Sequence, residues 1–254
     1  MRARNVAEVL EQLEKIVLHT KETASPLGYF AATYRQVTLK IREGIASGSF
    51  EDGPRMDRFA AALANRFLEA YASWRHREPI TRSWRVAFAA ADGDAPKSTI
   101  LQHLLLGMNA HINLDLGVTV ADVFSGAETE AFQGDFGALN DILEGTVDAL
   151  QSVLGKASPL LDILDRVGGR TDEVMIDFSM REARAMAWHV AQLLDALSPN
   201  HRDSFVRMQD KLVAQIGARI ARPGGLIGKT AEVIALSETF PIAEVIDAID
   251  TFSS

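Results

Sequence analysis

Apolar residues recur every three or four positions along most of the chain, the spacing that gathers them on one face of an α-helix. Short segments rich in Gly, Pro, Ser or Asp separate these stretches. No segment alternates apolar and polar residues in the way that a half-buried strand does. We predict an all-α, single-domain bundle of about ten helices over residues 1–254, with a candidate hinge at Gly168-Gly169.

One predicted helix, at roughly 96–124, is apolar almost all the way round, and such a helix belongs at the centre of a bundle. It nevertheless carries six polar residues. These are Gln102, His103, Asn109, His111, Asn113 and Asp115. Buried polar groups are tolerated only where they find partners. This helix is therefore expected to hold either a network of hydrogen bonds or a functional site.

His111 and Asp115 are four residues apart, so they share one helix face at a separation of about 6 Å along the axis. That separation lets them bind one metal ion together or hydrogen-bond to each other. His103 lies about 12 Å from His111, which suits a second ion or an outer-shell role. Other helices must supply the remaining ligands, and Asp57 is one candidate. We predict zinc, manganese or iron if a metal is bound.

Three functions agree with this pattern. The first is a metal-dependent hydrolase acting on a small-molecule ester or phosphoester, in which Asn109 or Asn113 positions the substrate. Arg35, on the second predicted helix, is a candidate for holding an anionic group. The second is a non-catalytic binding or interaction protein whose polar residues only tie helices together. The third is a small-molecule or lipid pocket beside Gly107, a residue that suggests close approach by another backbone or a ligand.

Charge and composition narrow the alternatives. The net charge of −8 comes without a basic block, which disfavours nucleic acid as a partner. The chain has no Cys, so disulfides and cysteine-based sites are excluded. Polar residues interrupt the longest apolar run and the N-terminus lacks a signal-peptide pattern, so we expect a cytoplasmic protein without a membrane span. Neither the substrate nor the oligomeric state follows from these features.

The run from Gln102 to Leu116, QHLLLGMNAHINLDL, resembles the signature of an uncharacterised, mainly bacterial, all-helical family, a domain of unknown function. Further similarities lie in Phe30-x3-Tyr34-Arg35, in Arg55-Met56-Asp57 and around Trp188, so the resemblance covers most of residues 27–195. A second resemblance, to the zinc-dependent phospholipase C and P1 nuclease group, is confined to His103-x3-Gly107. Met108 stands where that group has Asp, so no residue role is transferred from it.

Overall fold

The computed structural model describes residues 2–92, 97–158, 160 and 180–251. These residues form α-helices, one π-helix and no strand, which confirms the all-α prediction. The helices are α1 (Val6–Glu22), α2 (Leu27–Ser47), α3 (Gly53–Arg75), α4 (Arg82–Ala89), α5 (Ile100–Ala110), the π-helix η1 (His111–Leu116), α6 (Gly117–Val123), α7 (Ala127–Ala131), α8 (Gln133–Ala157), α11 (Met180–Ala196), α12 (Pro199–Ala221), α13 (Gly225–Ser237) and α14 (Ile242–Asp250). The candidate hinge at Gly168-Gly169 lies outside the described residues.

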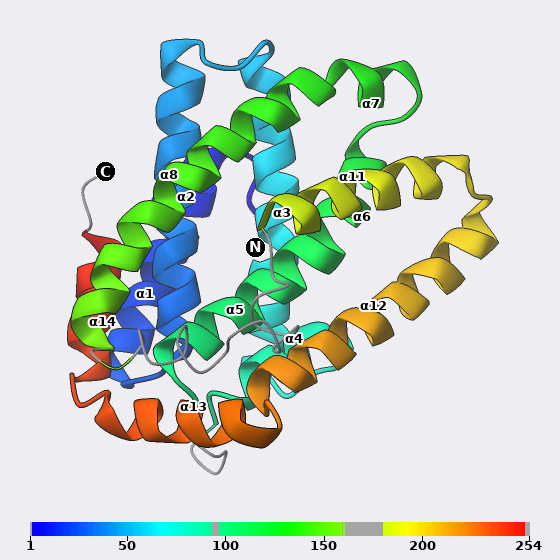
Figure 1. The fold of residues 1–254 in the computed structure, drawn as a ribbon. Helices are drawn as coiled ribbons and strands as arrows, with labels where there is room; N and C mark the ends of the chain where they lie inside the picture. Colours follow the sequence, from blue (N-terminus) through cyan, green and yellow to red (C-terminus); the bar gives the residue numbers. More distant parts are fainter. Residues whose placement is uncertain (1, 93–96, 159, 161–179, 252–254) are drawn as a thin grey trace.

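Helices α5, η1 and α6 follow one another without a break and form the central helix, Ile100–Val123 (Figure 1). Helices α2, α3, α4, α11 and α12 all pack against it. Within the described part of the chain, this is the helix whose length and composition would allow it to cross a membrane, and 83% of its most apolar window is buried inside the protein. Such burial is what the apolar circumference of a core helix requires.

The central helix begins with a capping box. The Thr99 hydroxyl accepts a hydrogen bond from the Gln102 backbone N–H at 3.1 Å, and the Gln102 side chain accepts one from the Thr99 backbone N–H at 2.9 Å. This arrangement satisfies two backbone donors that would otherwise be unpaired at a buried helix end. It also fixes the rotation of the helix, and so decides which faces its later polar residues present.

The segment η1 interrupts the α-helix at the position of the predicted site. A π-helix pairs each N–H with a carbonyl five residues earlier, and such turns occur mostly as short insertions that are frequent at functional sites. Here the segment runs from His111 to Leu116 and so includes Asp115. The Thr119 hydroxyl donates a hydrogen bond to the Asp115 carbonyl at 2.7 Å, which satisfies a backbone group near the end of this turn.

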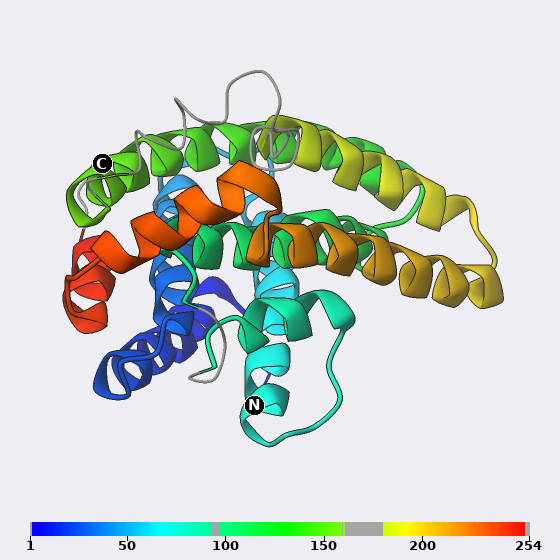
Figure 2. The same ribbon diagram turned by 60° about the horizontal axis from the view of Figure 1, so that its bottom comes forward.

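Helix α12 covers one side of the central helix and lies with α13 across the front of the molecule in Figure 2. The Gln102 side chain donates a hydrogen bond to the Ile220 carbonyl at 2.8 Å, and the Asn109 side chain donates one to the Val213 carbonyl at 2.9 Å. Two buried side-chain amides of the central helix thus hydrogen-bond to the backbone of α12 at two points. They set the register of the two helices, since sliding either helix would leave both amides unpaired.

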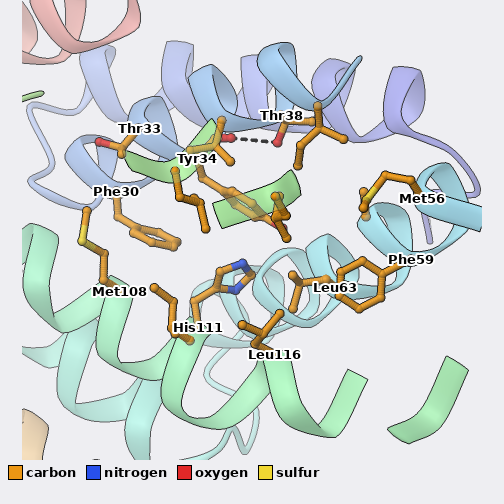
Figure 3. A pocket seen from close by; sticks show the side chains of 16 residues that line it. Phe30, Thr33, Tyr34, Thr38, Met56, Phe59, Leu63, Met108, His111 and Leu116 are labelled. Atoms are coloured by element: carbon orange, nitrogen blue, oxygen red, sulfur yellow. Dashed lines mark hydrogen bonds between the residues drawn. The ribbon is translucent and has the colours of Figure 1, made fainter. Parts of the chain in front are cut away.

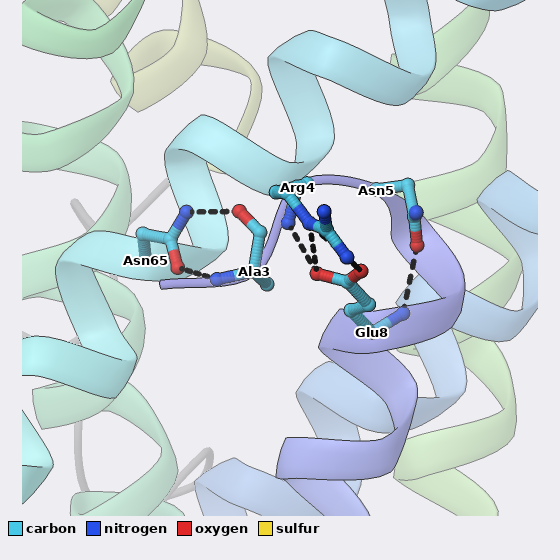
Figure 4. Close-up of polar contacts among 5 residues, drawn as sticks. All are labelled: Ala3, Arg4, Asn5, Glu8 and Asn65. Atoms are coloured by element: carbon cyan, nitrogen blue, oxygen red, sulfur yellow. Dashed lines mark hydrogen bonds and ion pairs between the residues drawn. The ribbon is translucent and has the colours of Figure 1, made fainter. Parts of the chain in front are cut away.

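The N-terminal segment is attached to α3 rather than free. The Asn65 side chain makes two reciprocal hydrogen bonds with the backbone of Ala3, both at 2.8 Å (Figure 4). The Asn5 side chain accepts a hydrogen bond from the Glu8 N–H at 2.9 Å and caps α1 (Figure 4). The segment before α1 is therefore packed against the middle of α3.

Candidate functional site

The polar residues of the central helix point to different sides. Asn109 faces α12, and Asn113 donates a hydrogen bond to the Asn109 side-chain oxygen at 3.0 Å. The Asn113 carbonyl accepts a further hydrogen bond from Gln209 on α12 at 3.1 Å. The two asparagines, predicted to position a substrate, therefore form a network that joins two helices. His111 and Asp115 lie on another side, toward α2, α3 and α4.

Asp115 is 2% exposed and is held by a residue far from it in the sequence. The Trp84 indole N–H on α4 donates a hydrogen bond to Asp115 Oδ2 at 2.8 Å. The His111 Nδ1 atom lies 3.8 Å from the same oxygen, which is too long for a hydrogen bond. Asp115 is therefore oriented by Trp84, and His111 stands beside it without being bonded to it.

The His111 Nδ1 atom is buried and has no hydrogen-bond partner among the described residues. A buried polar atom without a partner is rare in folded proteins and calls for an explanation. The ring itself packs well, because it meets the Tyr34 ring edge-on with 4.4 Å between centroids. The position thus suits the shape of the imidazole, while one of its nitrogens remains unpaired.

A cavity of about 70 Å³ lies against this imidazole, between α2, α3, α8 and the central helix (Figure 3). Its walls are almost entirely apolar. They are formed by Phe30, Thr33, Tyr34, Val37, Thr38, Ile41, Met56, Phe59, Ala60, Leu63, Met108, His111, Ile112, Leu116, Leu139 and Leu143. The hydroxyls of Thr33 and Thr38 each donate a hydrogen bond to a backbone carbonyl of α2. The polar groups left for a ligand are therefore the imidazole of His111 and the phenol of Tyr34.

Burial raises the pKa of the Tyr34 phenol far above its ordinary value, and the nearby charge of Asp115 raises it further. The phenol is therefore neutral at any physiological pH and keeps its O–H donor. That hydroxyl makes no hydrogen bond to another described residue. The wall of the cavity accordingly offers a certain donor from Tyr34 and, from His111, a nitrogen that donates or accepts according to its tautomer.

His103 lies elsewhere on the central helix, next to Gly107. It contacts the Tyr29 ring at 6.0 Å between centroids and lines a separate space of about 10 Å³ that does not include His111. Burial lowers the pKa of His103 to about 4, so this imidazole is neutral near pH 7. At Gly107 the close neighbour is the Phe30 ring, not the backbone or ligand that we predicted: a Cβ at residue 107 would lie 2.5 Å from this ring.

Two other predicted residues serve contacts away from His111. Asp57 accepts a hydrogen bond from the Val6 N–H at 2.7 Å and thus caps the start of α1. Arg35 is paired with Asp250 on α14 at 2.8 Å. Across the part of the chain that the structure describes, no three His, Cys, Asp or Glu side chains gather in a way that would hold a metal ion. The donor set at His111 consists of His111 and Asp115, whereas a zinc site takes three or four protein ligands.

Sequence reasoning missed Trp84 and Tyr34 as members of this site. The sequence pattern does not single out Trp84, and it includes Tyr34 only in the resemblance to the uncharacterised family. Both carry a polar group at the end of an apolar ring, and such groups usually find a partner when they are buried. Applied to the sequence, that rule would have marked Trp84 and Tyr34 as residues whose polar group needs a partner, without identifying the polar residue that each contacts.

Residues 6–223 match the model of one protein family, described as Family of unknown function (DUF5995). The chain belongs to this family. The match confirms the resemblance to an uncharacterised family that the sequence suggested. The matched region contains every residue that lines the cavity and both residues of the Trp84–Asp115 hydrogen bond. No curated protein and no solved structure matches the chain. Helices α13 and α14 follow the matched region.

Proposed function

We propose that this DUF5995 protein binds a small, mainly apolar molecule in the cavity at His111, and that the polar group of the ligand hydrogen-bonds to the imidazole. The observation that carries the proposal is the unpaired Nδ1 atom of His111 in the wall of an otherwise apolar cavity. Pockets for small molecules typically combine apolar walls with a few polar groups that fix orientation. The unpaired nitrogen and the Tyr34 hydroxyl fit that description.

The shape of the cavity indicates the class of ligand. Its residues on α2 run from Phe30 to Ile41, a length of about 16 Å at 1.5 Å per residue. The volume of about 70 Å³ is less than half that of an apolar cavity of about 150 Å³ that accommodates benzene. A long space of small volume is narrow. We therefore propose a straight acyl or alkyl chain that ends in one polar group.

The two other functions considered from the sequence explain less of this geometry. A purely structural network accounts for Asn109, whose side chain bonds to α12, and for Asn113, whose side chain bonds to Asn109. It leaves the His111 nitrogen unexplained, since a structural role would provide a partner for it. A metal-dependent hydrolase needs at least one further ligand, and the side chains described around His111 and Asp115 do not include one.

The experiment measures the thermal stability of the purified protein with short straight-chain carboxylic acids from propanoate to octanoate, followed by calorimetric titration. A ligand that binds only the folded state raises the melting temperature, by the equivalent of about 2.7 kcal/mol at a hundred times its Kd. We expect stabilisation that depends on chain length and reaches a maximum within the series. If no member of the series stabilises the protein, the proposal fails.

Two variants on α3 form a matched pair. Ala60→Leu fills the cavity from its wall, whereas Ala72→Leu makes the same change at an exposed position. We expect Ala60→Leu to abolish binding and Ala72→Leu to leave it unchanged. Equal binding by both variants would place the ligand elsewhere. Elemental analysis completes the test: zinc, manganese or iron at one ion per chain that is lost in His111→Phe would replace this proposal with the hydrolase.

A further inference from the structure

A second, more polar groove lies at the junction of α1, α3 and α4 and shares no residue with the cavity at His111. Its volume is about 840 Å³, within the range typical of small-molecule sites. It is lined by the end of α1, the end of α3 with the residues that follow it, and one side of α4. Three arginines stand around it: Arg75, Arg77 and Arg85.

These arginines are exposed, and none makes an ion pair or hydrogen bond through its guanidinium with a described residue. Two carboxylates also line the groove. Glu78 accepts a hydrogen bond from the Ser73 hydroxyl at 3.1 Å, and Asp92 is the second carboxylate. The groove therefore carries a net positive charge in a protein whose net charge is −8. A carboxyl-terminal helix dipole explains a cation near the end of α3, but it does not explain Arg85 on α4.

Arg77 occupies a backbone position that favours glycine. Its φ of 57° is left-handed, and it follows α3 in a turn in which the Arg77 N–H donates to the Trp74 carbonyl and the Glu78 N–H to the Ser73 carbonyl. Glycine is the usual residue at this position of such a helix end, because it has no Cβ to strain the backbone. An arginine at this position is less stable in backbone conformation than a glycine. What it adds to the groove is a guanidinium group.

Tyr71 adds a hydroxyl donor to the same groove. Its side chain belongs to a residue that is only 6% exposed, and its hydroxyl makes no hydrogen bond to another described residue. Burial raises the pKa of this phenol, while the positive charge of Arg75 opposes the increase. The hydroxyl is thus a neutral donor close to an arginine. A donor with no partner that lines a groove with three guanidinium groups is complementary to an oxyanion.

We propose that this groove binds a small organic phosphate, whose oxyanion is held by Arg75, Arg77 and Arg85 and accepts a hydrogen bond from Tyr71. Guanidinium groups bind phosphate through two parallel hydrogen bonds, and three of them compensate a dianion better than they suit a single carboxylate. The site is independent of the cavity at His111, so either proposal can fail without the other.

The test is a calorimetric titration of the full chain with phenyl phosphate and inorganic phosphate, with acetate and chloride as controls at equal ionic strength. We expect both phosphates to bind with at least tenfold higher affinity than acetate and to raise the melting temperature, while chloride leaves it unchanged. Binding of acetate as tight as that of phosphate would overturn the phosphate class. If neither phenyl phosphate nor inorganic phosphate binds, the proposed site is refuted.

Three arginine variants locate the binding. Arg77→Gly suits the left-handed backbone, so it should keep or raise the melting temperature while it lowers phosphate affinity at least tenfold. Arg85→Gln should lower the affinity in the same way. Arg58→Gln is the matched control, because Arg58 is exposed and unpaired on α3 but does not line the groove. Unchanged affinity in Arg77→Gly and Arg85→Gln, or an equal loss in Arg58→Gln, would refute the proposal.

Discussion

Replacement of His111 by phenylalanine tests whether its imidazole is retained for stability or for function. Phenylalanine keeps a flat ring against Tyr34, where the two rings now meet at 4.4 Å between centroids. It removes the Nδ1 atom that is buried without a partner. The slightly larger ring can expand toward the adjacent cavity of about 70 Å³. In this variant Asp115 keeps the hydrogen bond that it accepts from Trp84.

The expected magnitude follows from these contacts. An unsatisfied buried polar atom costs about 1–3 kcal/mol, and its removal returns that amount. The larger ring offsets part of this gain through tighter packing, by about 1 kcal/mol, the lower end of the usual cost, because the adjacent cavity offers space. We therefore expect His111→Phe to be more stable than the natural protein by about 1 kcal/mol, which corresponds to a rise in Tm of about 2–4 °C at this chain length.

Urea unfolding followed by circular dichroism measures the change, since a midpoint that moves without a change in slope reports stability alone. His189→Phe is the control, because His189 is exposed on α11 and a surface change should stay within about 0.5 kcal/mol. The opposite sign would refute the reasoning. If His111 were charged and paired with Asp115, its removal would leave a buried carboxylate uncompensated and would destabilise the protein by about 3–5 kcal/mol.

Three further predictions concern the surroundings of this site. Trp84→Phe removes the donor to Asp115 and should lower the free energy of unfolding by about 1–3 kcal/mol; a urea midpoint equal to that of the natural protein would contradict the role of this hydrogen bond. His103 has a folded-state pKa of about 4, below the ordinary value of 6.5, so its contribution to stability is complete above pH 6.5 and is lost as the pH falls toward 4. The loss should be on the order of 3 kcal/mol, and unfolding curves of His103→Gln across this range should lack it. Gly107→Ala places a Cβ 2.5 Å from the Phe30 ring and should destabilise the protein by about 1–3 kcal/mol, while the moved ring alters alkanoate binding in the titration described above. Unchanged stability and binding in that variant would show that Phe30 moves freely.

The sequence by itself determined the class of fold and the identity of its central element. Helical spacing of apolar residues is a local property, and an apolar surface on almost every side of the helix predicted at roughly 96–124 predicts that this helix is buried. The relation between His111 and Asp115 was equally local, because residues four apart in a helix must share a face. For these features the chain carries the whole explanation, and the structure agrees with it.

Tertiary structure decided which of the polar residues belong together. Periodicity shows that a face is buried, but it does not show what lies against it. Asp115 meets Trp84 from 31 residues away, and Asn109 meets Val213 from 104 residues away. Asp57 and Arg35, which the sequence offered as candidates for the site, instead contact the start of α1 and α14. The cavity likewise depends on how α2, α3, α8 and the central helix pack together, because empty space and unpaired atoms are properties of the assembled core and of no single segment.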